Sequence, residues 1–289
     1  MNEDILSILE YKMPSFSKGQ KRIATLIRES YDKAAFMTAS TLGRQAGVSE
    51  STVVRFAMEL GYEGYPQMQK AMQDMVLNRL TSVQRMGFTS DRLEGQDIVT
   101  SVIQADVDKL RQTIDSIDRD VFQKTVRDIV NAKEIYIIGV RSAAVLADFL
   151  GHYLQYMLER VHIINSSSSG EILEQLINVK AEDTIVAFSF PRYATASVEA
   201  AAYCRGVGAK VIGITNSEMS PMAEHCDCVL IAKSDMVSVV DSLVAPLSLV
   251  NALIVSVSAE KEKTLRKTFD KLEQIWQSHH VYANRDDIQ

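Results

Sequence analysis

Arginine and hydroxyl side chains follow several short apolar runs of this sequence, in a pattern that suits the binding of a small anion. A guanidinium group donates paired hydrogen bonds that fit a carboxylate or a phosphate, and a hydroxyl adds a neutral donor. Two arginines come after different runs, and together they predict a clamp for such an anion. The predicted site residues are Arg141, Ser142, Ser167, Ser168, Ser189, Arg192, Tyr193 and Ser197.

A structural role for the two arginines is the alternative. Acidic residues such as Asp148 and Glu199 lie close to them in sequence, and an ion pair with either would only hold a loop. The clamp is favoured because each of two loops in the same region carries an arginine, Arg141 in one and Arg192 in the other.

A second polar set lies near the N-terminus. Residues 42–56 predict a short helix, a turn at Gly47 and a second helix capped by Ser49. Apolar residues at helical spacing, such as Val53 and Phe56, would pack inward. The residues left facing outward are Ser51, Thr52, Arg55 and Glu59.

This anatomy is that of a helix-turn-helix, whose second helix enters the DNA major groove. An ordinary helical hairpin within a core is the alternative. The predicted contacts to a double-stranded DNA operator are Lys21, Arg44, Ser49, Glu50, Ser51, Thr52 and Arg55.

The anion-site residues need a scaffold, and the apolar runs supply it. These runs are continuous rather than alternating, which is typical of strands buried on both faces, and the segments between them are mostly long enough for crossover helices. The sequence therefore predicts an α/β unit with a parallel sheet about five strands wide. Ligands of such sheets bind beyond the carboxyl ends of the strands. The predicted strands are 135–139, 161–164, 184–188, 210–214 and 228–232.

The organisation that follows is an all-α domain and then an α/β domain. We predict a helix-turn-helix domain over residues 1–80, a linker over 81–96 where glycines and a serine replace apolar residues, and an effector-binding and oligomerisation domain over 97–289. Helix is predicted to resume over residues 241–278.

Composition excludes several classes of protein. No apolar run is long enough for a membrane span, and acidic residues occupy the N-terminus where a signal peptide would be positive, so a cytoplasmic protein is expected. The three cysteines are too few for a disulfide framework. His225, Cys226 and Cys228 lack a fourth convergent ligand, so neither a metal nor a cofactor is predicted.

The net charge of −6 belongs mostly to the C-terminal part. Residues 1–80 hold ten Lys or Arg against nine acids, whereas residues 131–289 hold fourteen against nineteen. A near-neutral DNA head binds weakly alone, so we predict a homodimer or homotetramer that combines two or more heads. An apolar stripe is a candidate interface, and burial against the sheet is its alternative: Leu243, Leu247, Val250 and Ile254.

The chain resembles the RpiR family of bacterial transcriptional regulators, which join a helix-turn-helix to a SIS (sugar isomerase) domain. Three segments carry the resemblance: residues 46–56 followed by Leu60-Gly61-Tyr62, residues 135–139 followed by Arg141-Ser142, and residues 187–193. The resemblance implies a three-layer αβα sandwich that binds a small sugar phosphate or phosphorylated sugar acid. It further implies that this carbohydrate derivative alters operator affinity.

The sequence departs from the family at its phosphate loop. SIS sites for sugar phosphates show Ser-x-Ser-Gly-x-Thr, whereas this chain has Pro191 for the second Ser, Arg192 for the Gly and Ala194 for the Thr. Arg141 likewise stands where many members have the second Gly of Gly-x-Gly. The loop has lost small donors and gained guanidinium groups, so the expected effector is an acidic metabolite.

Two other functions compete with this interpretation. A sugar-phosphate isomerase would need a general base, for which Glu171, Glu174 and His152 are nominal candidates, but a DNA-binding head would be superfluous there and no enzyme is predicted. The other is a DNA-binding protein whose SIS domain only dimerises and binds no ligand.

Overall fold

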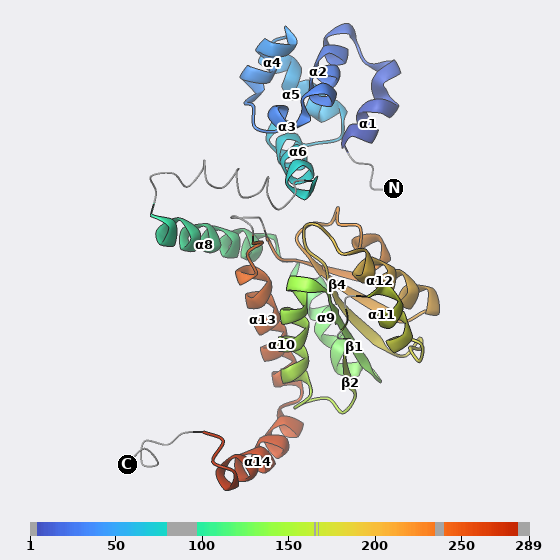
Figure 1. The fold of residues 1–289 in the computed structure, drawn as a ribbon, viewed down its shortest axis with the longest axis vertical. Helices are drawn as coiled ribbons and strands as arrows, with labels where there is room; N and C mark the ends of the chain where they lie inside the picture. The colour runs from blue at the N-terminus through green and yellow to red at the C-terminus, as the bar shows by residue number, and fades with distance from the viewer. Residues whose placement is uncertain (1–4, 80–96, 165, 167, 235–239, 283–289) are drawn as a thin grey trace. The chain divides into compact units, whose positions relative to one another are not determined.

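The computed structural model describes residues 5–79, 97–164, 166, 168–234 and 240–282. The chain divides into two compact units, Met1–Glu94 and Gly95–Gln289 (Figure 1). The predicted linker at 81–96 and the predicted site residue Ser167 lie outside the described residues. The proposed domain limits therefore stay a prediction.

The first unit is all helical, as predicted. Phe56 is fully buried at its centre, with the Phe16 ring packed edge-on at 5.2 Å between ring centroids. An N-terminal helix that was not predicted contributes buried Ile5 and Leu9 to this core. Its elements are α1 (Ile5–Lys12), a 3-10 turn (Met13–Ser15), α2 (Lys18–Glu29), α3 (Tyr31–Ala34), α4 (Ala39–Ala46), α5 (Glu50–Glu59) and α6 (Tyr65–Arg79).

The second unit is an α/β fold whose five strands are all parallel, in the order β2-β1-β3-β4-β5. This confirms the predicted fold class, with the apolar runs forming the strands. Its elements are α8 (Ile98–Ser116), α9 (Arg119–Asn131), β1 (Ile135–Gly139), α10 (Ala144–Leu154), β2 (Val161–Ile164), α11 (Ser169–Gln175), β3 (Thr184–Phe188), α12 (Thr195–Val207), β4 (Lys210–Thr215), β5 (Cys228–Ile231), α13 (Val244–Glu260) and α14 (Glu262–Ser278).

Helices cover both faces of this sheet, which makes three layers (Figure 1). On one face, Ile137 and Phe188 pack with residues of α9, α10 and α13. On the other face, Ile138 and Ala187 pack with residues of α11 and α12. The alternation along each strand explains why the strand sequences are apolar without interruption.

The strand order places a topological switch between β1 and β3. These two strands are hydrogen-bonded neighbours in register Gly139↔Phe188, while the chain continues from β1 to β2 on one side and from β3 to β4 on the other. Loops that leave the carboxyl ends of two such strands diverge and open a crevice between them.

Helix resumes after the sheet, as predicted over residues 241–278. The structure has two helices, α13 and α14, bent by 98° at their junction. The stripe proposed as an interface, Leu243, Leu247, Val250 and Ile254, instead packs in the core beside the sheet. No single helix of the described residues is long and apolar enough to cross a membrane, and the bent pair passes that test only jointly.

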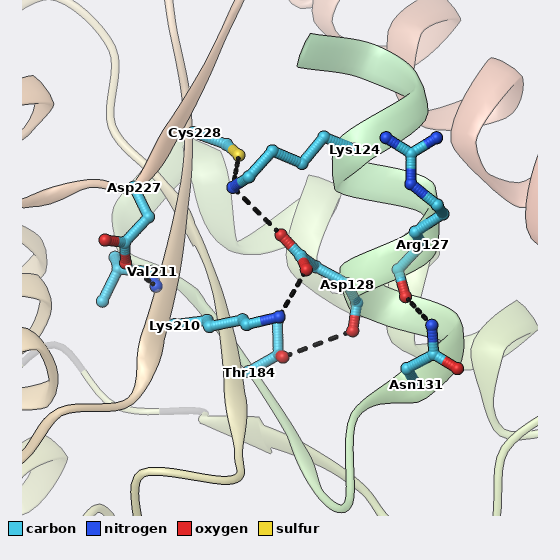
Figure 2. Close-up of polar contacts among 9 residues, drawn as sticks. All are labelled: Lys124, Arg127, Asp128, Asn131, Thr184, Lys210, Val211, Asp227 and Cys228. Carbon is cyan, nitrogen blue, oxygen red and sulfur yellow. Dashed lines mark hydrogen bonds and ion pairs between the residues drawn. The ribbon is translucent and has the colours of Figure 1, made fainter. Parts of the chain in front are cut away.

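A polar cluster fastens α9 to the amino ends of the strands (Figure 2). The Asp128 carboxylate accepts a hydrogen bond from Lys210 at 2.6 Å and from Lys124 at 3.3 Å. Lys124 also lies 2.8 Å from the Cys228 sulfur. Burial alone would raise the pKa of Asp128, but the hydrogen bonds from the two lysines outweigh it and hold that pKa below its ordinary value.

We expect Asp128→Asn to lower the free energy of unfolding at pH 7 by about 1–2 kcal/mol, because the two lysine ammonium groups lose their carboxylate partner. The loss is modest because both lysine side chains are half exposed, so that water solvates them. A depressed carboxyl pKa stabilises the fold above the unfolded-state value and loses its effect as the pH falls through the folded-state value. The variant and the parent should therefore converge in acid, as measured by urea denaturation. Asp115→Asn, at an exposed position of α8, is the control, and an equal loss there would contradict the prediction.

Candidate functional sites

The predicted helix-turn-helix is formed by α4, a tight turn and α5. Gly47 ends α4 in the left-handed conformation with φ 66°, which a residue with a β-carbon adopts only at a cost. The Val48 N–H donates to the Gly43 carbonyl at 2.8 Å and closes the turn. The Ser49 hydroxyl then accepts from the Thr52 N–H at 3.3 Å and caps α5.

One face of α5 is committed to the core and the other is open. Val53 and Phe56 are fully buried, whereas Glu50, Ser51 and Arg55 are exposed, as the helical spacing predicted. The Arg55 side chain leans back on its own helix, where Nε donates to the Ser51 carbonyl at 3.3 Å. This open face has the shape and polarity of a helix that reads base edges.

Of the other two residues predicted to face outward, Glu59 is exposed and Thr52 is half-buried. The Thr52 methyl lies near Gly19 of α2, so this residue lies at the margin of the open face. Glu59 accepts a hydrogen bond from Gln20 of α2, and its carbonyl accepts one from Lys12 at 2.6 Å. Glu59 therefore ties α5 to its neighbours.

Basic side chains lie near the turn. Lys21 and Arg44 are exposed, and Arg44 belongs to the last turn of α4. The Arg22 guanidinium nitrogen lies 3.0 Å from the position of a β-carbon built on Gly47. Arg22 thus approaches the turn more closely than its place in the sequence suggested, which makes it a further candidate for phosphate contact.

In the second unit, both predicted clamp arginines have unusual backbone conformations at neighbouring strand ends. Arg141 follows β1 with φ 60° and Arg192 follows β3 with φ 64°. Among the described residues, only His280 is another non-glycine residue with positive φ. Both arginines are exposed and flank the β1/β3 switch. At both positions an arginine therefore has a backbone conformation that favours glycine.

Buried hydroxyls gather beside these loops. Ser189 and Ser197 are 2% and 1% exposed, and neither hydroxyl has a hydrogen-bond partner among the described residues. Thr215 at the end of β4 and Ser220 in the loop after it share this state, and sequence analysis missed both. Ser189 and Thr215 follow core residues of the α13 face, so they point to the opposite face, where α12 begins. An orphaned buried hydroxyl is costly, about 1–3 kcal/mol.

The remaining predicted residues form the rim of this edge. The Tyr193 hydroxyl donates to the Asn216 side-chain oxygen at 2.9 Å, which joins the loop after β3 to the end of β4. Ser142 and Ser168 are exposed. The Ser166 hydroxyl donates to Glu171 at 2.5 Å and accepts from the Ser168 N–H at 3.0 Å.

The alternative roles weighed for these residues are judged from their places in the fold. Asp148 and Glu199 are exposed residues of α10 and α12. His152, a candidate base, lies in the last turn of α10, at the opposite end of the helix from the strand edge, and contacts Tyr156. Glu171, another candidate for a general base, lies in the first turn of α11, and its carboxylate accepts the hydrogen bond from the Ser166 hydroxyl.

The cysteines are placed as core residues. Cys226 packs with the α12 layer and Cys228 with the α13 layer, on opposite faces of the sheet. Burial raises the pKa of Cys204 and of Cys226 to about 12, so both are thiols at neutral pH. Within the described residues, no group of three or more His, Cys, Asp or Glu could hold a metal ion.

The chain joins a helix-turn-helix unit to a parallel α/β unit with a polar strand edge. This combination defines a class of DNA-binding regulators in which one chain carries both a DNA-binding domain and an α/β domain suited to ligands. Two family models match the chain: the helix-turn-helix domain of the rpiR family over residues 3–78 and the SIS domain over residues 128–256. The protein belongs to the RpiR family of helix-turn-helix transcriptional regulators, with an N-terminal DNA-binding domain and a C-terminal SIS domain.

Curated relatives agree with this membership, and solved structures share the fold. The chain is 24% identical over 226 residues to the HTH-type transcriptional regulator HexR of Pseudomonas aeruginosa, covering 76% of each chain. Its fold is similar to that of Vibrio vulnificus NanR complexed with ManNAc-6P, with a TM-score of 0.60, 22% identity, and coverage of 97% of this chain and 100% of NanR. The sugar isomerase domain of an RpiR transcription factor from Sphaerobacter thermophilus covers 62% of this chain, with 99% of that domain matched, at a TM-score of 0.59 and 24% identity.

Proposed function

We propose that the SIS domain binds a small anionic, sugar-derived metabolite at the β1/β3 edge and that this binding alters the affinity of the helix-turn-helix for its operator. The observation that carries the proposal is the pair of left-handed arginines on adjacent strand ends. A non-glycine residue in this conformation costs about 1–2 kcal/mol, and such strain concentrates at ligand-binding sites. Two strained arginines at one edge of the sheet support a role for both side chains in binding.

The buried hydroxyls support a polyhydroxylated ligand. Ser197 lies in the first turn of α12, which has no side-chain cap, while Ser189 follows β3 and Thr215 ends β4 on the same face of the sheet. A sugar or acid group that reached this helix N-terminus would give the hydroxyls and free N–H groups their partners. Pro191 and Ala194 remove two phosphate donors, so we favour a carboxylate-bearing ligand, such as a phosphorylated sugar acid, over a neutral sugar.

The ManNAc-6P held by NanR supports the class of ligand, since it is a phosphorylated sugar. We propose further that the protein acts in the cytoplasm as a homodimer or homotetramer. Paired heads would read a palindrome whose half-sites are about one helical turn, or a multiple, apart.

A two-part titration tests this function. We expect phosphorylated sugar acids to raise the melting temperature of the full chain, because a ligand at one hundred times its dissociation constant adds about 2.7 kcal/mol. The same compounds should change operator affinity in fluorescence anisotropy, whereas neutral sugars should do neither. A panel of phosphorylated acids and phosphorylated sugars that leaves both measurements unchanged would refute ligand control.

A further inference from the structure

The last helix carries an apolar stripe that the described residues cover only in part. No residue of α14 is buried, although the helix is amphipathic. Its large apolar side chains recur at alternating spacings of four and three residues: Leu265, Phe269, Leu272 and Trp276. This is the spacing of a seam at which two helices pair.

Contacts among the described residues cover the beginning of this seam and touch its end, where the Trp276 ring lies 5.3 Å from that of Tyr282. Leu265 packs against the sheet-side core, and the Phe269 ring lies 5.7 Å from that of Tyr156 on α10. Beyond this point the helix leaves the α/β body, as the 98° bend after α13 requires (Figure 1). Of the four seam residues, Phe269 is 37% exposed, and the other three, Leu265, Leu272 and Trp276, are half-buried. A seam of large apolar side chains in this position is a surface for a partner.

The seam is complementary to itself when a second copy runs antiparallel. A twofold axis between Asp270 and Lys271 sets Leu265 against the partner's Trp276 and Phe269 against the partner's Leu272. A large side chain then meets a leucine at every step. Such self-complementarity is the requirement of an interface with twofold symmetry.

The charges beside the seam select the same arrangement. Arg266 and Glu273 are exposed and flank the stripe on one side, one before and one after the axis. In the antiparallel pair, Arg266 lies beside the partner's Glu273, and symmetry gives this contact twice. A parallel pair would set Glu273 beside the partner's Thr268 and lose both ion pairs. Charge complementarity therefore favours a second copy of this chain in the antiparallel orientation.

We propose that α14 is a homotypic docking helix, which joins two copies of the chain through an antiparallel seam of Leu265, Phe269, Leu272 and Trp276. The inference rests on the homo-oligomer of the proposed function and assigns one of its contacts. It gives the C-terminal helix a role in bringing two DNA-binding heads together.

A charge-swap cycle in the full chain tests the seam. Arg266→Glu and Glu273→Arg each set like charges across the axis, so each should raise the dimer dissociation constant about tenfold. The double variant restores opposite charges in both copies and should recover the parent value. Lys267→Glu makes the same change of charge one position away, on the outer face, and is the matched control. Sedimentation velocity over a concentration series measures all four proteins.

Trp276 supplies a second readout, because it is the only tryptophan of the chain. Its emission should shift to the blue, and acrylamide should quench it less, as the parent protein dimerises. Leu272→Glu should abolish this concentration dependence. Far-UV circular dichroism of each variant checks that α14 stays helical.

Two results overturn the proposal in distinguishable ways. If the parent is dimeric but the charge variants and Leu272→Glu dimerise equally well, the α14 seam is wrong and the homo-oligomer stands through another surface. If the parent stays monomeric at micromolar concentration with an unchanged Trp276 spectrum, both the seam and the proposed homo-oligomer fall.

Discussion

Arg55→Ala is expected to weaken operator binding by at least about thirtyfold. An arginine that donates in pairs to a guanine contributes about 1–3 kcal/mol of discrimination, and two heads on a palindrome would lose it twice. The fold should be unaffected, since Arg55 is exposed and its side chain donates to the Ser51 carbonyl of its own helix. Fluorescence anisotropy with operator DNA measures the affinity, and thermal unfolding checks the fold.

The comparison with Arg55→Lys separates base recognition from charge. Lysine keeps the positive charge but cannot make the planar paired contact, so binding to non-specific DNA should survive while preference for the operator falls. If Arg55→Ala binds the operator as tightly as the parent, Arg55 lies outside the interface. The contacts from α5 to the base edges would then come from Ser51 and Glu50.

Arg192→Gly is expected to reduce effector affinity at least tenfold without loss of stability. Removing a hydrogen bond to a charged partner costs about 1.5–3 kcal/mol of binding. Glycine adopts φ 64° freely, which relieves native strain of about 1–2 kcal/mol and offsets the greater flexibility of its unfolded chain. Calorimetry with the ligand identified by the titration measures the first effect, and the melting temperature measures the second.

Controls distinguish the clamp from a structural arginine. Arg192→Lys should recover little affinity, because an ammonium lacks the planar fork. Arg127→Ala removes an exposed arginine of α9 in the same unit and should leave ligand binding unchanged. A structural role for Arg192 predicts the reverse pattern, in which the glycine variant binds ligand like the parent but unfolds at a lower temperature.

Much of the fold could be predicted because its signals are local. The continuous apolar runs became β1 to β5, and Gly47 with Ser49 fixed the turn and cap of the helix-turn-helix. The division of the C-terminal helical region was not local information. Residues 241–278 have helix-forming sequence throughout, and the structure shows that α13 ends at Glu260 and packs its apolar side chains on the sheet.

The sequence by itself determined which residues are available to this protein: an open polar rank on α5 and arginines in place of glycines at 141 and 192. Periodicity and residue type suffice for that, since both act within a few residues. Only the tertiary structure decided that β1 and β3 are neighbours, which brings Arg141 and Arg192 to one edge. It also decided that Thr215 and Ser220 are buried there, with no hydrogen-bond partner for either hydroxyl among the described residues, because burial and strand order depend on contacts between residues far apart in the chain.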